Sequence, residues 1–391
     1  MAISSQIPLI SVELREYLES ILGFEMTKKY LSAITTPMED YTLHIFQKQE
    51  LADSIIERIL ECEFKAYQHP DFLNLIITQP KGPFKIESQE ILKEIIVDNR
   101  AAEMIYQGSD IFVPGIKRAN KVKENDLVYV KNQKGIVVAK AEALMSHNTI
   151  LTKNKGIAAK NLESYYKVPS VSQLGLDDYP VYFHSFPAYL TSLNLNPQKG
   201  EKILDCCAAP GNKTIHLSEL NKGTGNIIAV DRSKTRLAHL MKKISKFRIK
   251  NITAVVGNII ELSKQWTVKF DKILLDPPCT ALGLRPRLVL ETTKKTIETT
   301  AKYQKAILFA CNQLLKPGGE LVYSTCTITK EENEDVIYQA SDVELEIIDQ
   351  DYKDLKIVST DLESHPYIQR FIPGRDKTLG YFIAKLKKLQ S

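Results

Sequence analysis

Two kinds of hydrophobic pattern divide the first half of the chain. Apolar residues recur at helical spacing in residues 11–31 and again in 49–64, which predicts amphipathic helices. From residue 94 to about 166 the pattern changes to short β-like runs, DIFVPGI, DLVYVKN and GIVVAKAEAL, separated by turn residues. We therefore expect a helical N-terminal part followed by a compact β-rich module.

Beyond residue 168 strand-like and helical patterns alternate. The runs KILDC, NIIAVD, ITAVVG, DKILLD and GELVYST are separated by helical patterns at 213–222, 233–247 and within 292–316. This alternation predicts an α/β fold with a doubly wound, mostly parallel sheet, and LEIID and LGYFIAKL could add an antiparallel pair at its edge. With 391 residues the chain is longer than one hydrophobic core usually supports, so more than one domain is expected. We expect three parts, residues 1–91, 92–166 and 167–391.

Composition narrows the class of protein only slightly. The six cysteines include no C-x-x-C pair, which favours a reducing compartment over a disulfide framework or zinc site, so we expect no metal. No apolar run approaches membrane-spanning length and the N-terminus lacks a signal-peptide pattern, so we expect a cytoplasmic protein. The net charge of +5 permits a nucleic-acid partner without deciding for one.

A tight turn, DCCAAPGNKT at 205–214, leaves the first predicted strand of the sheet. Such turns let a ligand approach helix N-terminal amides, but the glycine spacing is not G-x-G-x-x-G and Pro210 removes one amide, which disfavours a pyrophosphate. Asp231 ends the next strand, where an acid either takes ribose hydroxyls or caps the helix beginning at Ser233. With Asn258 and Asp276 at the next two strand ends, the pattern favours S-adenosylmethionine over NAD or ATP.

The candidate cofactor residues are the turn and the polar residues at the strand ends: Cys207, Ala208, Ala209, Pro210, Gly211, Asn212, Lys213, Asp231, Arg236, Asn258 and Asp276.

Two cysteines differ from the other four. Cys279 in DPPC and Cys326 in YSTC each follow a predicted strand, whereas the others fit small buried hydrophobes. Cytosine C5 accepts a methyl group only after a nucleophile adds to C6, and a thiolate suits that addition. Asp276 could then hydrogen-bond the base at N3 and N4. An aromatic residue in place of Cys279 would have indicated methylation of an exocyclic amine. If the D-P-P segment were only a rigid end to its strand, that would explain its two prolines but not the presence of a second cysteine at the same edge of the sheet.

These motifs carry a resemblance to a known family. DCCAAPGNKT, LLDPPCTALGLRPR, YSTCTITKEENE and RFIPGRDKTLGYFIAKL are similar to the motifs of the Sun-family RNA cytosine-5 methyltransferases, whose fold is the Rossmann-like class I methyltransferase fold. The resemblance implies that Cys326 is the nucleophile, that Cys279 assists proton removal or product release, and that Lys213 lies near the reaction centre.

The sequence departs from that family at several points. Asn212 replaces a glycine that is usual in relatives, a change we attribute to the tolerance of Asn for left-handed geometry. YTLHIFQK, residues 41–48, stands where many relatives carry R-V-N-T. Thr329 and Glu332 match a helix capping box, which is a sufficient structural explanation for both.

The β-rich module resembles a PUA domain, a small β-barrel of RNA-modifying enzymes, through V-P-G-I, N-D-L-V-Y-V and G-I-V-V-A-K. Its basic loop either binds RNA or is simply a solvated face. The candidate RNA contacts are Lys117, Arg118, Lys121, Arg285 and Arg287. Sun-family members with a PUA domain methylate nucleotide 72 of the tRNA acceptor stem. The resemblance thus implies an S-adenosylmethionine-dependent tRNA methyltransferase that holds the acceptor stem and CCA end. We expect a monomer. Ribosomal RNA methylation and a non-catalytic RNA-binding scaffold are the alternatives.

Overall fold

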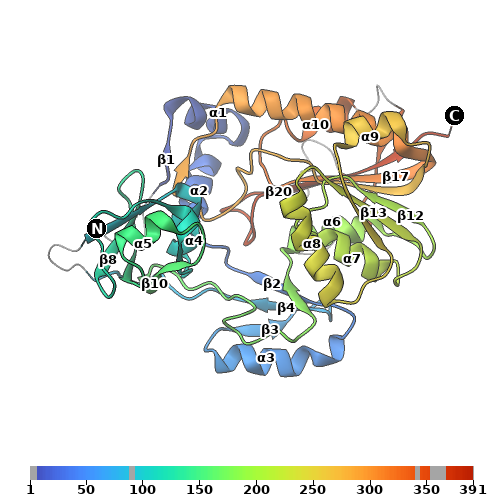
Figure 1. Ribbon diagram of the computed structural model, residues 1–391. Coiled ribbons are helices and arrows are strands. Elements are labelled where there is room, and N and C mark those ends of the chain that lie inside the picture. Colours follow the sequence, from blue (N-terminus) through green and yellow to red (C-terminus); the bar gives the residue numbers. More distant parts are fainter. Residues whose placement is uncertain (1–6, 88–92, 340–343, 353–366, 391) are drawn as a thin grey trace.

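The computed structural model describes residues 7–87, 93–339, 344–352 and 367–390 (Figure 1). At the N-terminus β1 (Leu9–Ile10) precedes α1 (Val12–Leu22) and α2 (Phe24–Ile34). The helical pattern of residues 11–31 thus forms two helices, because Gly23 adopts a φ of 76° between them. The side chain of Ser11 accepts a hydrogen bond from Leu14 N and caps α1.

The N-terminal part is less helical than its pattern predicts. It also contains β2 (Tyr41–Ile45), η2 (Gln49–Leu51), α3 (Ala52–Glu61), β3 (Ala66–Gln68) and β4 (Leu75–Thr78). These strands join β11 (Val181–Phe183) in a four-stranded sheet of order β11-β2-β4-β3. Because β4 is buried along its whole length, its sequence lacks the alternation that identifies a half-exposed strand.

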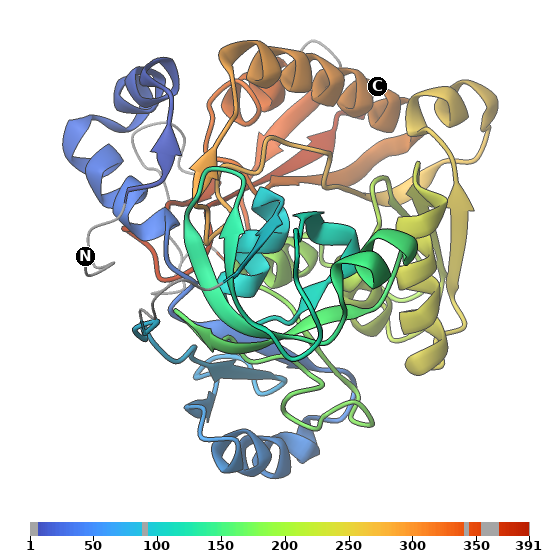
Figure 2. The same ribbon diagram turned by 60° about the vertical axis from the view of Figure 1, so that its left-hand side comes forward.

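The β-rich module has its own sheet and core. Its elements are β5 (Lys93–Val97), α4 (Asn99–Tyr106), β6 (Ile111–Phe112), η3 (Val113–Gly115), β7 (Ile116–Arg118), β8 (Leu127–Asn132), β9 (Val137–Ala143), α5 (His147–Thr152) and β10 (Ile157–Ser164). The sheet order is β6-β10-β9-β8-β5-β7. Alternate residues of β8 are buried and share a core with α4 residues such as Ile105, as the period-two pattern predicts. The strands and helices of this module, coloured cyan to green, gather together in Figure 2.

The last part is an eight-stranded sheet of order β14-β13-β12-β15-β17-β20-β18, with β19 paired to β20. Its elements are α6 (Phe186–Leu195), β12 (Lys202–Asp205), α7 (Asn212–Leu220), β13 (Asn226–Asp231), α8 (Lys234–Lys246), β14 (Ile252–Val256), α9 (Ile259–Gln265), β15 (Phe270–Leu275), β16 (Val289–Leu290), α10 (Lys294–Leu314), β17 (Leu315–Thr325), α11 (Glu334–Ile337), β18 (Leu345–Ile348), β19 (Ile368–Phe371) and β20 (Tyr381–Lys388).

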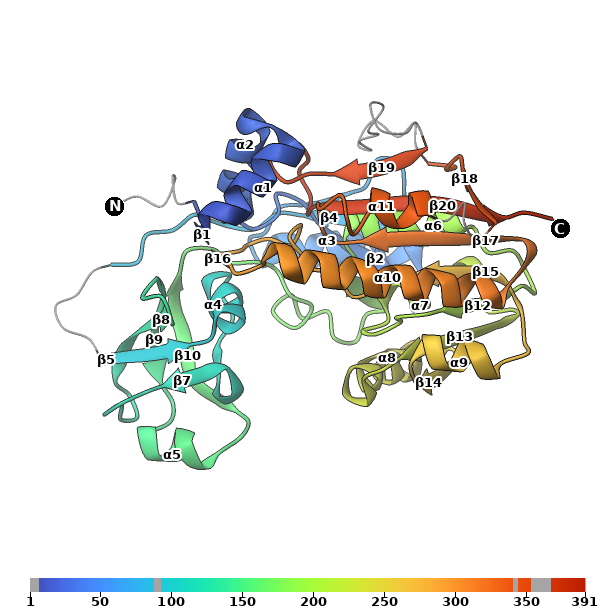
Figure 3. The same ribbon diagram turned by 90° about the horizontal axis from the view of Figure 1, so that it is seen from above.

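The central strands β12 to β15 and β17 are parallel, while β18 and β20 pair antiparallel. The predicted α/β class and antiparallel edge are therefore confirmed. Helices α6 to α8 cover one face of the sheet and α9 to α11 the other (Figure 3). This double winding leaves the carboxyl ends of the parallel strands as the place for a ligand.

The N-terminal helices lie against the segments that follow the D-P-P-C and S-T-C motifs. Leu14 and Leu31 share a buried cluster with Leu282 and Ile328, and Tyr30 Oη donates to Leu282 O at 2.7 Å. Strand β1 pairs with β16. Residues distant in sequence thus support the loops that carry the thiols. In the described part of the chain, no helix is both long and apolar enough to cross a membrane.

Candidate active site

A cavity of about 340 Å³ opens at the carboxyl ends of β12, β13 and β15. Predicted site residues that line it are Cys207, Ala209, Asp231, Arg236, Asp276, Cys279 and Cys326, and the remaining lining residues are Cys206, Arg232, Ser233, Gly257, Ile259, Pro277, Pro278, Ala281 and Tyr303. The fold therefore brings both predicted thiols and both predicted carboxylates into one space. Ala208, Pro210, Gly211, Asn212, Lys213 and Asn258 are absent from this lining set.

The turn after β12 is shaped by Gly211 rather than by Asn212. Gly211 has a φ of 102°, and a Cβ on it would lie 2.5 Å from Leu240 Cδ1. Asn212 is instead the first residue of α7, and its Nδ2 donates to Phe183 O at 2.8 Å. The expectation that Asn212 needs left-handed geometry is therefore wrong. Glycine is required one residue earlier, where the chain reverses against α8.

Asp231 serves the backbone while facing the cavity. Its Oδ1 accepts from Ser233 N at 2.8 Å and its Oδ2 accepts from Ala209 N at 3.1 Å. Ser233 itself caps α8 by accepting from Arg236 N. Each carboxylate oxygen has a second lone pair, so Asp231 can stabilise the turn and still accept from a ligand hydroxyl.

Asn258 acts as a helix cap in this structure. Its side chain accepts from Ile260 N at 3.2 Å and begins α9. The neighbours Gly257 and Ile259 line the cavity in its place. The strand end was thus correctly located, but the cavity is lined by the residues on either side of the predicted one.

A second acidic side chain, Asp276, is paired with a lysine. Its Oδ2 lies 2.6 Å from Lys213 Nζ, and its Oδ1 accepts from Ser324 Oγ at 3.1 Å. Burial alone would lower the pKa of Lys213, but the Asp276 carboxylate overcomes this and raises that pKa above its ordinary value. The pair therefore offers a fixed cationic donor beside an anionic acceptor.

The two thiols of the cavity lie next to each other. Cys279 Sγ and Cys326 Sγ are 3.4 Å apart. The hydrogen bond to Cys326, followed by burial, raises the pKa of Cys279 well above its ordinary value. Cys279 is therefore held in the protonated thiol form next to Cys326 Sγ.

Glu332 joins the two thiol-bearing loops. Its carboxylate accepts from Thr280 N at 2.8 Å, Thr280 Oγ1 at 2.5 Å, Thr329 Oγ1 at 2.8 Å and Gln304 Nε2 at 3.3 Å. No helix begins at Thr329, because α11 starts after its N-cap residue Asn333. The capping-box prediction is therefore wrong, and the fully buried carboxylate instead ties the residue after Cys279 to the S-T-C loop.

Sequence reasoning missed a tyrosine on α10. Tyr303 lines the cavity, and its hydroxyl accepts from Arg232 Nη1 at 2.9 Å. The guanidinium carbon of Arg232 lies 5.5 Å from the tyrosine ring centroid. A single tyrosine in a 21-residue helix has no spacing signal, so only the packing of α10 beside β15 reveals it.

The candidate RNA contacts fall into two separate groups. Lys117, Arg118 and Lys121 are exposed on the β-rich module. Arg285 instead donates to Thr36 O and Oγ1 at 3.0 and 2.7 Å, and Arg287 Nη1 lies 3.1 Å from Glu103 Oε2 on α4. The two arginines therefore make intramolecular contacts, and Arg287 fastens the β-rich module to the loop after D-P-P-C.

Comparison with known proteins agrees with this architecture. Residues 192–387 match the family model "16S rRNA methyltransferase RsmB/F", and residues 93–165 match the PUA domain model. The chain is 34% identical to a tRNA (cytosine(72)-C(5))-methyltransferase of Pyrococcus horikoshii over 97% of both chains. It is 32% identical to mouse NSUN6, named as the same kind of enzyme, over 73% of this chain and 66% of that one. A crystal structure described as NSun6 from Pyrococcus horikoshii with SFG matches with a TM-score of 0.86 and 33% identity, covering 97% of this chain and 99% of that one.

Proposed function

The chain belongs to the RsmB/F (Sun) family of S-adenosylmethionine-dependent cytosine-5 methyltransferases, and we propose from this premise that its substrate is tRNA and its target cytosine 72. The observation that carries the proposal is the pair of thiols 3.4 Å apart in a cavity that also holds Asp231 and Asp276. Similarity to tRNA (cytosine(72)-C(5))-methyltransferases over nearly the whole chain, including the PUA domain, supports the choice of RNA.

The cavity suits S-adenosylmethionine, which supplies an electrophilic methyl group. Asp231 would accept the ribose hydroxyls, and the turn with Cys207 and Ala209 would face the methionine end. The related crystal structure with SFG, an analogue of S-adenosylmethionine, supports this use of the site.

Cys326 is the proposed nucleophile and Cys279 its supporting thiol. The Cys326 thiolate adds to C6 of the cytosine, which makes C5 electron-rich enough to accept a methyl group. After transfer a base removes the C5 proton, and the Cys326–C6 bond breaks as the ring double bond reforms. Because Cys279 is held as a thiol, its S–H can donate a hydrogen bond to the Cys326 sulfur and stabilise the thiolate that leaves C6.

Lys213 and Asp276 are proposed to recognise the target base. Cytosine presents an N4 amino donor next to the N3 acceptor, and the ion pair offers an acceptor next to a donor. Uracil, with a carbonyl at C4, would leave Asp276 facing an acceptor. The pair thereby favours cytosine over uracil and stabilises charge as the ring is attacked.

We propose domain bounds of 1–91 for the N-terminal part, 92–166 for the PUA domain and 167–391 for the catalytic part. The PUA domain would hold the acceptor stem and CCA end through Lys117, Arg118 and Lys121. Arg285 and Arg287 would contribute indirectly, by fixing the domain relative to the thiol loops. Glutamate at all three basic positions should raise the KM for tRNA and leave S-adenosylmethionine affinity unchanged. An unchanged KM would remove this surface from the proposal.

Bisulfite sequencing tests the function directly. Purified protein and S-adenosylmethionine are incubated with unmodified total tRNA, and protection at cytosine 72 is expected. The family model is named for 16S rRNA, so ribosomal RNA forms the second arm. Protection confined to ribosomal RNA would overturn the tRNA proposal, and no protection in either RNA would favour a non-catalytic scaffold. A cytoplasmic monomer is proposed alongside, to be checked by fluorescence microscopy and light scattering.

A further inference from the structure

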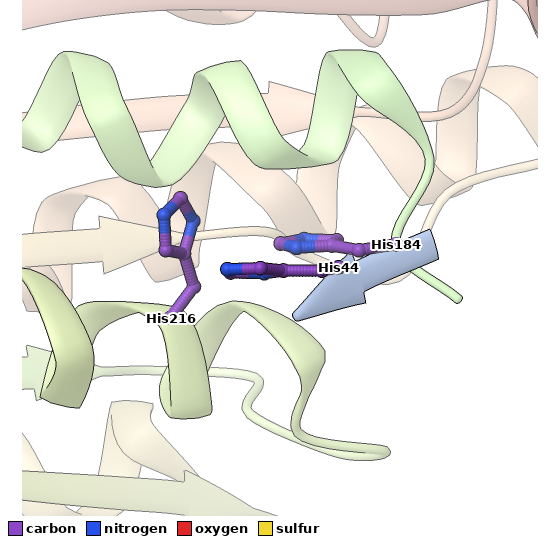
Figure 4. A group of neighbouring side chains, drawn as sticks. All are labelled: His44, His184 and His216. Atoms are coloured by element: carbon purple, nitrogen blue, oxygen red, sulfur yellow. The ribbon is translucent and has the colours of Figure 1, made fainter. Parts of the chain in front are cut away.

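Three buried histidines converge outside the thiol cavity. His44 lies on β2, His184 directly follows β11, and His216 lies on α7 (Figure 4). One ring nitrogen of each lies within 4.8 Å of one from each of the others. All three side chains are at most 1% exposed. Elements from the four-stranded sheet and from the catalytic part thus place three imidazoles around one point.

Five of the six ring nitrogens of this histidine cluster have no side-chain hydrogen-bond partner. Within the described residues, Nδ1 of His44 and both ring nitrogens of His184 and His216 are buried without a hydrogen bond. A neutral imidazole has one donor and one acceptor nitrogen, and buried polar atoms are rarely left unpaired. Three unpaired rings at one point therefore need a common partner, which the neighbouring side chains do not supply.

The surroundings leave one nitrogen of His44 free for that partner. Its Nε2 already lies 2.8 Å from Glu219 Oε2 and 3.0 Å from Asn74 Nδ2, so Nδ1 remains. A carboxylate beside the far nitrogen of a ligating histidine is the usual outer shell of a metal site. Glu219 is itself held by Gln47 N, which donates to Oε1 at 2.7 Å.

Charge and packing agree with neutral rings fixed in place. All three rings are buried, where a charged imidazolium would be costly, and a neutral imidazole keeps one nitrogen lone pair available. The ring of Tyr189 stacks on His216 at 4.3 Å between centroids. This packing holds the imidazoles without using their nitrogens.

We propose that His44, His184 and His216 bind a divalent transition metal ion, most simply Zn²⁺, with water in the fourth position. Imidazole is a preferred ligand for Zn²⁺, and tetrahedral coordination at about 2.0–2.1 Å would require the nitrogens to approach to about 3.4 Å. The ion would fasten β2 and the segment before α6 to α7, whose first turn carries Lys213. This role is structural and independent of the proposed methyl transfer.

The test uses full-length protein without a histidine tag, dialysed against Zn²⁺ and then against metal-free buffer. We expect about one Zn²⁺ per chain by mass spectrometry, a melting temperature that falls with chelator and recovers with Zn²⁺, and a tetrahedral Co²⁺ spectrum without a thiolate charge-transfer band. The double variant Cys279→Ala, Cys326→Ala should retain the metal, which separates this site from the thiols.

Variants His184→Phe and His216→Phe keep an aromatic ring and should lose the metal, while the exposed His239→Gln control should retain it. If either phenylalanine variant fails to fold, the Zn²⁺ content, Co²⁺ spectrum and chelator dependence of the wild-type protein decide whether the site exists. Wild-type protein that holds no Zn²⁺, gives no Co²⁺ band and melts at the same temperature with chelator would overturn the proposal. Loss of Zn²⁺ in the double cysteine variant would do the same.

Discussion

Two pairs of cysteines have similar distances between their sulfur atoms but different surroundings. Cys206 and Cys311 have their sulfurs 3.0 Å apart, and Cys279 and Cys326 have theirs 3.4 Å apart. The first pair belongs to a cluster of apolar side chains between β12 and α10, and of the two only Cys206 also borders the cavity. The second pair opens to the cavity that Asp276 also lines, and its two loops are joined by Glu332.

The comparison teaches that closeness of thiols does not make a reactive site. Both pairs contain one thiol whose pKa is raised, in Cys206 by burial first and in Cys279 by its partner first. Cys206 and Cys311 are packed among apolar side chains, whereas Cys279 and Cys326 lie beside Asp276 and the Glu332 carboxylate that joins their loops. The polar neighbours of Cys279 and Cys326 are the difference, and each of them can be changed by mutation.

The largest effect is expected for Cys326→Ala. Without the attacking sulfur no bond to C6 forms, so methylation should fall about 10³-fold or more, and denaturing gels should show no enzyme–tRNA crosslink. The matched control is Cys311→Ala, which should retain activity within about threefold because its sulfur faces apolar side chains. Equal losses in both variants would erase the distinction between the pairs.

A different outcome is expected for Cys279→Ala. Addition to C6 and methyl transfer remain possible, but release is impaired, so turnover should fall about 10²-fold while a slowly migrating crosslinked species accumulates. Denaturing gels with labelled tRNA follow that species. A crosslink in Cys326→Ala and none in Cys279→Ala would exchange the two assigned roles.

The third prediction concerns Glu332→Gln, which keeps the shape but removes the charge from the link between the thiol loops. The amide cannot accept all four donors, so we expect about a tenfold fall in kcat with unchanged cofactor affinity by calorimetry. The variant Glu331→Gln, at a half-buried position that contacts Tyr17 Oη instead, should have a smaller effect. Full activity of Glu332→Gln would show that the thiols are positioned without the charge of the Glu332 carboxylate.

Alkylation compares all four thiols in one sample. Because the pKa of Cys279 is raised, only a small fraction of it is thiolate at pH 8, and that fraction grows as the pH rises. Iodoacetamide should therefore label Cys326 about tenfold faster than Cys279 at pH 8, and this ratio of rates should be smaller at pH 10. Cys206 and Cys311 should react only after unfolding. Peptide mass spectrometry gives the rates, and faster labelling of Cys279 at pH 8 would contradict the proton assignment.

The smallest effect should be on stability. Cys311→Ala removes a sulfur from a packed cluster and should cost about 1 kcal/mol, or a melting temperature lower by about 2–4 °C. Cys279→Ala, at the cavity wall, should change the melting temperature by less. Differential scanning calorimetry of both variants measures the two melting temperatures. A larger decrease for Cys279→Ala than for Cys311→Ala would indicate tighter packing around Cys279 and Cys326.

The sequence by itself determined the sheet and the residues of its ligand edge. Alternating strands and helices require a doubly wound sheet, and residues just after parallel strands must meet at one edge, which is why Asp231, Asp276, Cys279 and Cys326 were found together. Short-range physics was enough there, because each residue's place follows from the strand before it.

Tertiary structure alone decided what those residues contact. Tyr303, Glu332 and the histidine cluster depend on helices and loops brought together from distant segments, and no spacing in the chain encodes such meetings. The same holds for Arg287, which contacts Glu103 of the PUA domain 184 residues away. Periodicity reports which face of an element is buried, whereas the partner on that face is chosen by the packing of the whole chain.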